Sequence, residues 1–125
     1  MKIVGTLVAT AALTLAVSAG ASAEGDAVAG KKVFNKCRAC HSFDAKKKIG
    51  PTLAGVMGRK AGAIEGYRYS KAFQASDVVW DDISIAAYLT APRKFMKGTK
   101  MAFAGLRKPA DIANVIAFIK ANNPQ

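Results

Sequence analysis

Both cysteines and the only histidine of this chain fall within five consecutive residues, the sequence CRACH at positions 37–41. Thiols and an imidazole at this spacing occur in three kinds of site. They can form a redox-active thiol pair, contribute ligands to a zinc site, or anchor a haem covalently through the CxxCH pattern. The surrounding sequence distinguishes between these chemistries.

Two of the three alternatives fit this sequence poorly. A thioredoxin-type pair stands at the start of a helix within an α/β pattern, because the helix dipole lowers the thiol pKa. Here the CxxC follows a helical pattern and no strands alternate with helices. In an exported protein, Cys37 and Cys40 could also simply form a short disulfide. A structural zinc site has four ligands, but no cysteine or histidine follows His41.

Covalent haem attachment is the interpretation favoured by the motif. Two thiols three positions apart can project to one side of a helical turn and add to the two vinyl groups of a haem. His41 is then held beneath the iron, and it is the only imidazole available to bind it.

The beginning of the chain has the pattern of an export signal. An apolar run at residues 3–17 precedes the sequence Ala-Ser-Ala at 21–23, the small-residue pattern after which signal peptidases cut. This run is shorter than the ~20 apolar residues of a typical membrane span. We therefore expect residues 1–23 to be a signal peptide cleaved after Ala23, and residues 24–125 to form one periplasmic domain.

Apolar spacing and capping residues predict three main helices. Each begins with a residue suited to a helix start: aspartates at two of them and a proline at the third. The predicted helices run from Asp26 to about Cys40, from Asp81-Asp82 to just before Pro92, and from Pro109 through at least Ile119.

A long loop is predicted between the first two helices. Residues 42–66 contain five glycines among several lysines and arginines. A long loop without structure of its own needs something to pack against, and a domain of about 100 residues with few large apolar side chains is short of core. A flat apolar cofactor in the interior would give the loop a surface to pack against and would complete the core.

The mature sequence resembles the class I cytochromes c, close to the mitochondrial and small bacterial type, from Gly25 to Asn122. The matching stretches are GKKVFNKCRACH, GPTLAGVMGRKAG, Trp80 with Tyr88 eight residues later, YLTAPRKF, GTKMAFAGLRK and IAFIKAN. The resemblance implies an all-α, single-domain cytochrome c fold. It would have about three main helices, short helices and long loops wrapped around one covalently bound haem c with its iron.

The same resemblance implies roles for individual residues. His41 looks like the proximal iron ligand, and Pro51 matches a proline whose carbonyl accepts the other ring N–H and fixes the imidazole. Positions that hydrogen-bond the haem propionates in the family are matched by Arg59, Tyr69 and Trp80. The expected cofactor-binding set is completed by Cys37, Cys40, Tyr88, Thr99 and Met101. Residues matching the crossing of the two terminal helices are Gly30, Phe34 and Phe118.

Met101 is the expected sixth ligand. Met57 lies 16 residues after His41, in the loop expected on the proximal side, whereas Met96 and Met101 both lie beyond the second helix. Met101 sits in GTKMAF, which matches the family's ligand loop, and Met96 is the remaining alternative. The chain departs from the family by having Lys97 where a proline usually precedes the glycine, so the loop should be looser.

The implied function is one-electron transfer rather than catalysis. With histidine and methionine both bound, the iron has no open site for oxygen or peroxide chemistry. Thioether sulfur and burial of the iron both favour the ferrous state, so a high-potential carrier is expected. The rival classes are a peroxidase-like enzyme with a labile sixth site, and a haem-free thiol oxidoreductase or basic binding module.

The charge of the chain points to acidic partners. The net charge is +11, and cations near the haem edge would steer docking to acidic faces of redox proteins. Such partners include a bc-type complex, a terminal oxidase, a reaction centre or a periplasmic dehydrogenase, with at most transient contact with a membrane surface. Export argues against nucleic acid, and we expect a monomer. The basic residues matched by motif are Lys32, Lys36, Lys48, Arg93, Lys94, Lys100, Arg107 and Lys108.

Overall fold

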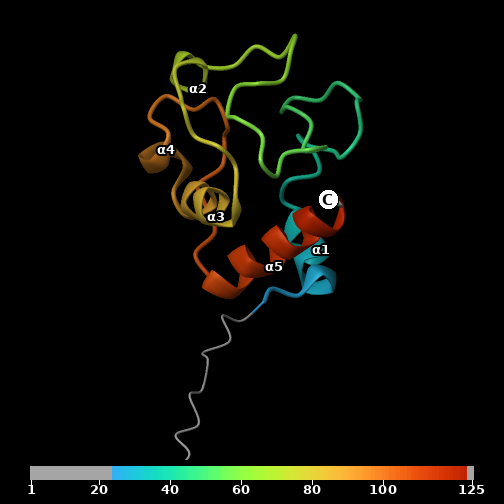
Figure 1. The fold of residues 1–125 in the computed structure, drawn as a ribbon. Helices are drawn as coiled ribbons and strands as arrows, with labels where there is room; N and C mark the ends of the chain where they lie inside the picture. Colours follow the sequence, from blue (N-terminus) through green and yellow to red (C-terminus); the bar gives the residue numbers. More distant parts are fainter. Residues whose placement is uncertain (1–23, 124–125) are drawn as a thin grey trace, which may run out of the picture.

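The computed structural model describes residues 24–123, and every regular element in this range is a helix (Figure 1). One isolated β-bridge joins Lys60 and Val79. The helices are α1 (Ala27–Phe34), α2 (Lys71–Gln74), α3 (Asp82–Thr90), α4 (Pro92–Phe95) and α5 (Pro109–Ala121). The predicted all-α fold with long loops is confirmed. The predicted signal peptide lies outside the described residues.

Helix α1 begins where the sequence predicts and ends earlier. The Asp26 carboxylate accepts hydrogen bonds from the backbone N–H groups of Val28 and Ala29, at 2.7 and 3.2 Å. The prediction that this helix continues to about Cys40 was wrong, because the chain leaves α1 after Phe34 in a series of turns. Their backbone bonds mix spacings of three and four residues, which is typical of a tightening helix end.

Helix α3 has the predicted start and is followed by a short helix that was not predicted. Asp81 and Ser84 cap each other's backbone N–H groups, at 2.7 and 2.9 Å, in a capping box. Pro92, expected only to follow the end of α3, occupies the first position of α4, where its missing N–H costs nothing. Helix α2 was also unpredicted, and the Ser70 hydroxyl caps it.

Helices α1 and α5 pack across each other (Figure 1). Gly30 of α1 lies against the backbone of Asn114, so closely that a Cβ atom at position 30 would overlap the Asn114 carbonyl. The ring of Phe34 packs against that of Phe118, with centroids 5.2 Å apart. The predicted crossing of the terminal helices at Gly30, Phe34 and Phe118 is therefore observed.

Replacing Gly30 with alanine should destabilise the fold. In an isolated helix this change would stabilise by about 1 kcal/mol, but here the added methyl group overlaps backbone that cannot rotate away. We expect a net loss of about 3 kcal/mol in the free energy of unfolding, at the upper end for overpacking. Val28→Ala on the exposed face of α1 is the control, with a change within about 0.5 kcal/mol. Denaturant unfolding of both variants measures the change in the free energy of unfolding. A Gly30→Ala protein more stable than the unaltered one would contradict the close contact between Gly30 and Asn114.

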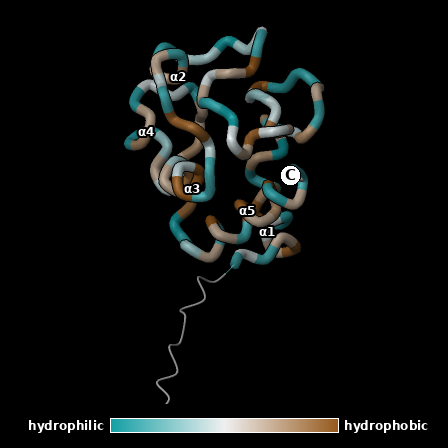
Figure 2. The backbone as a smooth tube through the Cα atoms, viewed as in Figure 1, coloured by the Kyte–Doolittle hydropathy of each residue, from teal (hydrophilic) through white to brown (hydrophobic). Residues whose placement is uncertain are grey.

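Both α3 and α5 contain hydrophobic residues, which are drawn in brown (Figure 2). Val115, Ile116 and Ile119 of α5 are buried, and so are Ile85 and Tyr88 of α3. None of the helices between residues 24 and 123 has the length and apolar character needed to cross a bilayer. Beside this buried core, helix faces and loops together surround a cavity.

Candidate functional site

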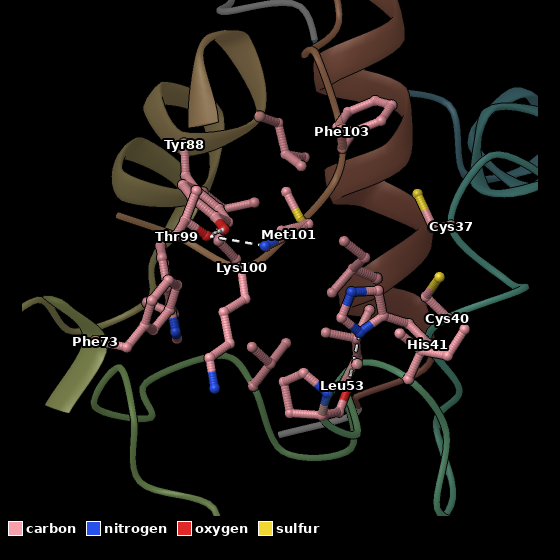
Figure 3. Close-up of a pocket in the computed structure, with 18 of the residues that line it drawn as sticks. Cys37, Cys40, His41, Leu53, Phe73, Tyr88, Thr99, Lys100, Met101 and Phe103 are labelled. Atoms are coloured by element: carbon pink, nitrogen blue, oxygen red, sulfur yellow. Dashed lines mark hydrogen bonds between the residues drawn. The ribbon is translucent and has the colours of Figure 1, made fainter. Parts of the chain in front are cut away.

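A cavity of about 270 Å³ lies among the turn after α1, the long loop, α3, α5 and the segment after α4 (Figure 3). A single water needs roughly 10–15 Å³ by the same measure, so the space is sized for a much larger group. Most of its lining is apolar and aromatic, with a few polar groups that converge on it. This composition is typical of a cofactor site.

The ten residues expected to bind the cofactor all line this cavity. They come from segments as far apart as the turn after α1 and the arm that follows α4. The ten are Cys37, Cys40, His41, Pro51, Arg59, Tyr69, Trp80, Tyr88, Thr99 and Met101.

The two cysteines present their sulfurs on the same side of the cavity (Figure 3). Both are free thiols, and backbone bonds from Cys40 and His41 to the Cys37 carbonyl, at 3.0 and 2.9 Å, hold the turn that carries them. Burial raises the pKa of the Cys37 thiol. Reactive thiols of oxidoreductases have a lowered pKa, so this environment disfavours the thiol-redox alternative.

Zinc binding is also disfavoured by the geometry. Across residues 24–123, no three histidine, cysteine or acidic side chains are grouped so that they could hold a metal ion together. A structural zinc site would need four such ligands.

The His41 ring is fixed so that one nitrogen keeps a free lone pair. Its Nδ1 lies 2.8 Å from the Pro51 carbonyl oxygen, and a carbonyl can only accept, so Nδ1 carries the proton. Burial lowers the pKa of His41 and favours the neutral ring, although the Pro51 bond opposes this shift. Gly50 lies flat against the ring, since a Cβ there would meet Cε1 at 2.5 Å. Nε2 is therefore available as a ligand.

Met101 is carried on an arm that is tied to α3. The Tyr88 hydroxyl and the Thr99 hydroxyl lie 2.7 Å apart, and the Met101 backbone N–H donates to the same Thr99 oxygen at 3.3 Å. Met96 is buried in the core, and Met57 packs against that core. Of these three methionines, only Met101 lines the cavity.

Arg59 is a half-buried cation without a carboxylate partner. Its guanidinium donates to the carbonyls of Ala54 and Thr52, at 2.7 and 2.8 Å, which hold the planar group in place. None of the ion pairs found within residues 24–123 involves it. Guanidinium has five N–H donors, so this side chain keeps donors for an anionic group at the cavity wall.

Tyr69 and Trp80 are linked to other aromatic rings of the wall. The Tyr69 hydroxyl accepts the backbone N–H of Ile64 at 3.3 Å. Its ring stacks on Phe73 at 5.8 Å, and Trp80 lies 5.3 Å from Tyr88. Phe73 also lies 6.1 Å from Trp80, so Tyr69 and Trp80 belong to one continuous aromatic wall.

Several lining residues were not predicted. They are Leu53, Tyr67, Phe73 and Phe103, together with residues of the core helices such as Ile85, Val115 and Ile119. Apolar spacing marked the helical ones as core, but nothing in the sequence says that their buried face meets a cavity. Phe103 follows Met101 by two positions and Leu53 follows Pro51 by two, which is the only local signal for either.

Residues 27–123 match the family model described as Cytochrome c. The chain belongs to the cytochrome c family. It is 43% identical to cytochrome c-554 of Methylosinus trichosporium over 122 residues, covering 95% of this chain and 92% of that protein. It is 48% identical to cytochrome c2 of Rhodoblastus acidophilus over 97 residues, covering 76% and 91%. Among solved structures, cytochrome cH from Methylobacterium extorquens matches with a TM-score of 0.74 and 44% identity, covering 78% of this chain and 99% of that one.

Membership of the family establishes the cofactor. This chain is a homologue of electron-carrying cytochromes c and binds haem c with its iron. Cys37 and Cys40 are the two cysteines of the CxxCH motif for covalent attachment. The described residues fit the group in three respects. The thiols face one side of the cavity, His41 keeps a lone pair, and an unpaired Arg59 stands where an acid group could be bound.

The Met101 arm has backbone geometry that would accept a proline at position 97. Met96, the preceding residue, has φ −126° and ψ 87°, which lies outside the α region that a following proline disfavours. The Lys97 N–H donates no backbone hydrogen bond, and its φ is not positive. Lys97→Pro should therefore stabilise the protein by about 0.4–1 kcal/mol through the unfolded chain. Urea unfolding measures this, with Lys97→Ala as the control for loss of charge; a destabilised proline variant would contradict the description of the arm.

Proposed function

We propose that this cytochrome c is a soluble, periplasmic one-electron carrier, with His41 and Met101 as the axial ligands of the haem iron and no enzymatic activity of its own. The observation that supports this most is the pairing of these two side chains across one cavity, from which Met57 and Met96 are excluded. Export would require cleavage of the signal peptide after Ala23.

In this proposal the haem iron supplies the chemistry by accepting and releasing one electron. The chain supplies position and environment. The Pro51 carbonyl accepts the Nδ1–H of His41 and so orients the imidazole. Thr99 and Tyr88 hold the backbone of the Met101 arm. With both positions filled by side chains, no site is left open for peroxide. The sulfur ligand and the apolar wall favour the reduced state and hence a high potential.

The proposed docking face is the basic surface around the cavity mouth. Lys36 and Lys100 line the cavity itself, and Lys48 donates to the Arg38 carbonyl at 2.6 Å, which places its amine beside the CxxCH turn. The other matched cations, Lys32, Arg93, Lys94, Arg107 and Lys108, are exposed. Acidic partner surfaces would be attracted to such a face and released quickly.

The electron-transfer rate with an acidic partner, such as a bc-type complex, tests this function. The second-order rate constant should fall as salt is raised to ~0.15 M, where the Debye length is ~8 Å. Lys36→Gln should lower the rate at low salt, whereas Lys120→Gln, whose amine pairs with Asp82 at 2.8 Å and is not on the cavity lining, should not. A rate that is indifferent to salt, or equal losses in both variants, would refute the basic docking face.

A further inference from the structure

Residues 64–69, here called the strap, are bonded to both walls of the cavity. The Tyr67 hydroxyl donates to the Ile49 carbonyl at 2.9 Å, and Ile49 directly precedes Gly50 and Pro51, which contact His41. The adjacent residue of the strap, Arg68, accepts the Lys100 amine on its carbonyl at 2.9 Å. Two neighbouring residues therefore connect the His41 side to the Met101 side.

Lys100 reaches the strap along the cavity. It directly precedes Met101, and its side chain runs along the cavity away from that residue (Figure 3). The bond to Arg68 spans 32 residues of sequence, and the Tyr67 bond spans 18. Neither bond belongs to a helix or to the bridge at Lys60, so both act only between loops.

Hydrogen bonds and a ring contact within the strap hold its residues together. The Tyr67 N–H donates to the Ile64 carbonyl at 3.4 Å, and the Ile64 N–H donates to the Tyr69 hydroxyl at 3.3 Å. The Tyr67 and Tyr69 rings pack edge to face at 4.7 Å. Gly66 gives the turn its shape with φ +76°, a value that side chains rarely adopt.

The strap is anchored at its Tyr69 end, where the ring stacks on Phe73 and the carbonyl accepts the Gln74 amide at 2.9 Å. Across the rest of the strap, residues 64–68, the hydrogen bonds to other segments are those of Tyr67 and Lys100. Glu65, Gly66 and Arg68 are exposed, whereas Tyr67 and Tyr69 line the cavity. Segments with little buried apolar surface and exposed hydrogen bonds open at low free-energy cost. Opening of the strap would uncover the cavity between the two proposed ligands.

We propose that the strap is a cover that joins the two ligand-bearing walls, and that Tyr67 and Lys100 are positioning residues that hold it closed against small ligands. This inference rests on the proposed function, because it concerns access to an iron whose sixth ligand is Met101. The chemical class excluded is a small neutral ligand of iron, for which imidazole is the probe.

Tyr67→Phe and Lys100→Leu in the ferric holoprotein test the proposal. Each removes one hydrogen bond and keeps most of the apolar side chain. The rate of imidazole binding should rise roughly two- to tenfold in each variant, the effect of losing one such bond, and further in the double variant. Lys97→Leu removes the same charge from the same arm, and Lys97 makes no hydrogen bond or ion pair with any residue in 24–123. Its rate should stay at that of the unaltered protein.

Hydrogen–deuterium exchange in residues 64–69 provides a readout that does not depend on which side chain binds iron. Tyr67→Phe and Lys100→Leu should increase exchange there by a similar factor, with α1 and α5 unchanged. If both variants bind imidazole and exchange strap amides at the rates of the unaltered protein, the strap does not act as a cover. That result would leave the haem spectrum and the proposed function intact. A rise in Lys97→Leu as large as in Lys100→Leu would also overturn the proposed cover, because charge rather than the bond would then be responsible.

Discussion

Replacing both Cys37 and Cys40 with alanine should give protein that retains no haem after denaturation. The two thiols face one side of the cavity, and they are the only cysteines in the chain, so no other thioether can form. Without the covalent bonds, only the proposed ligands His41 and Met101 and packing would hold the haem. We expect essentially complete loss of covalent haem, measured as the mass of the denatured polypeptide.

The single Cys40→Ala variant separates the two attachments. It should keep one thioether at Cys37 and retain haem less firmly than the unaltered protein. Conservative replacement of a serine outside the cavity lining, such as Ser76→Ala, is the control and should keep the full haem mass. Full covalent haem in the double alanine variant would show that attachment does not use these thiols.

Met101→Ala should lower the reduction potential and abolish the sulfur-to-iron charge-transfer band of the ferric protein. Axial ligation sets haem potentials over roughly 0.8 V, and loss of a soft sulfur that favours ferrous iron should cost on the order of 0.1 V or more. The open position should also bind imidazole without the delay imposed by a resident ligand. Potentiometric titration followed by absorption measures both effects.

Met96→Leu is the matched control for this experiment. Met96 is buried in the core and does not line the cavity, so a leucine of similar volume should cost less than about 1.5 kcal/mol of stability. The charge-transfer band and the potential should survive. A band that disappears in Met96→Leu and persists in Met101→Ala would reverse the ligand assignment.

The sequence predicted the long elements of the fold and missed the short ones. Asp26, Asp81 and Pro109 are strong local signals, and helices start at or next to each of them. Helix α2 has four residues, too few for a periodic pattern. The end of α1 was placed too late because apolar spacing continues through Cys37, whereas the backbone tightens into turns after Phe34.

Sequence motifs also identified the cavity residues that lie in them, but not the contacts between distant segments of the chain. Resemblance to a family supplied the ten site residues, and the CxxCH motif alone supplied three of them. The Tyr67 hydrogen bond joins residues 18 positions apart, and the Lys100 hydrogen bond joins residues 32 positions apart. Loop residues have no periodicity that could reveal such partners, so these contacts needed a structure.

The absorption spectrum of the protein, made in cells with a working cytochrome c maturation system, shows directly whether the chain carries a haem with a sulfur ligand. We expect a c-type haem spectrum in both oxidation states, with a sulfur-to-iron charge-transfer band in the ferric form that marks Met101 as a ligand. A colourless protein would contradict the assignment of a haem carrier, and a ferric haem without that band would contradict ligation by His41 and Met101.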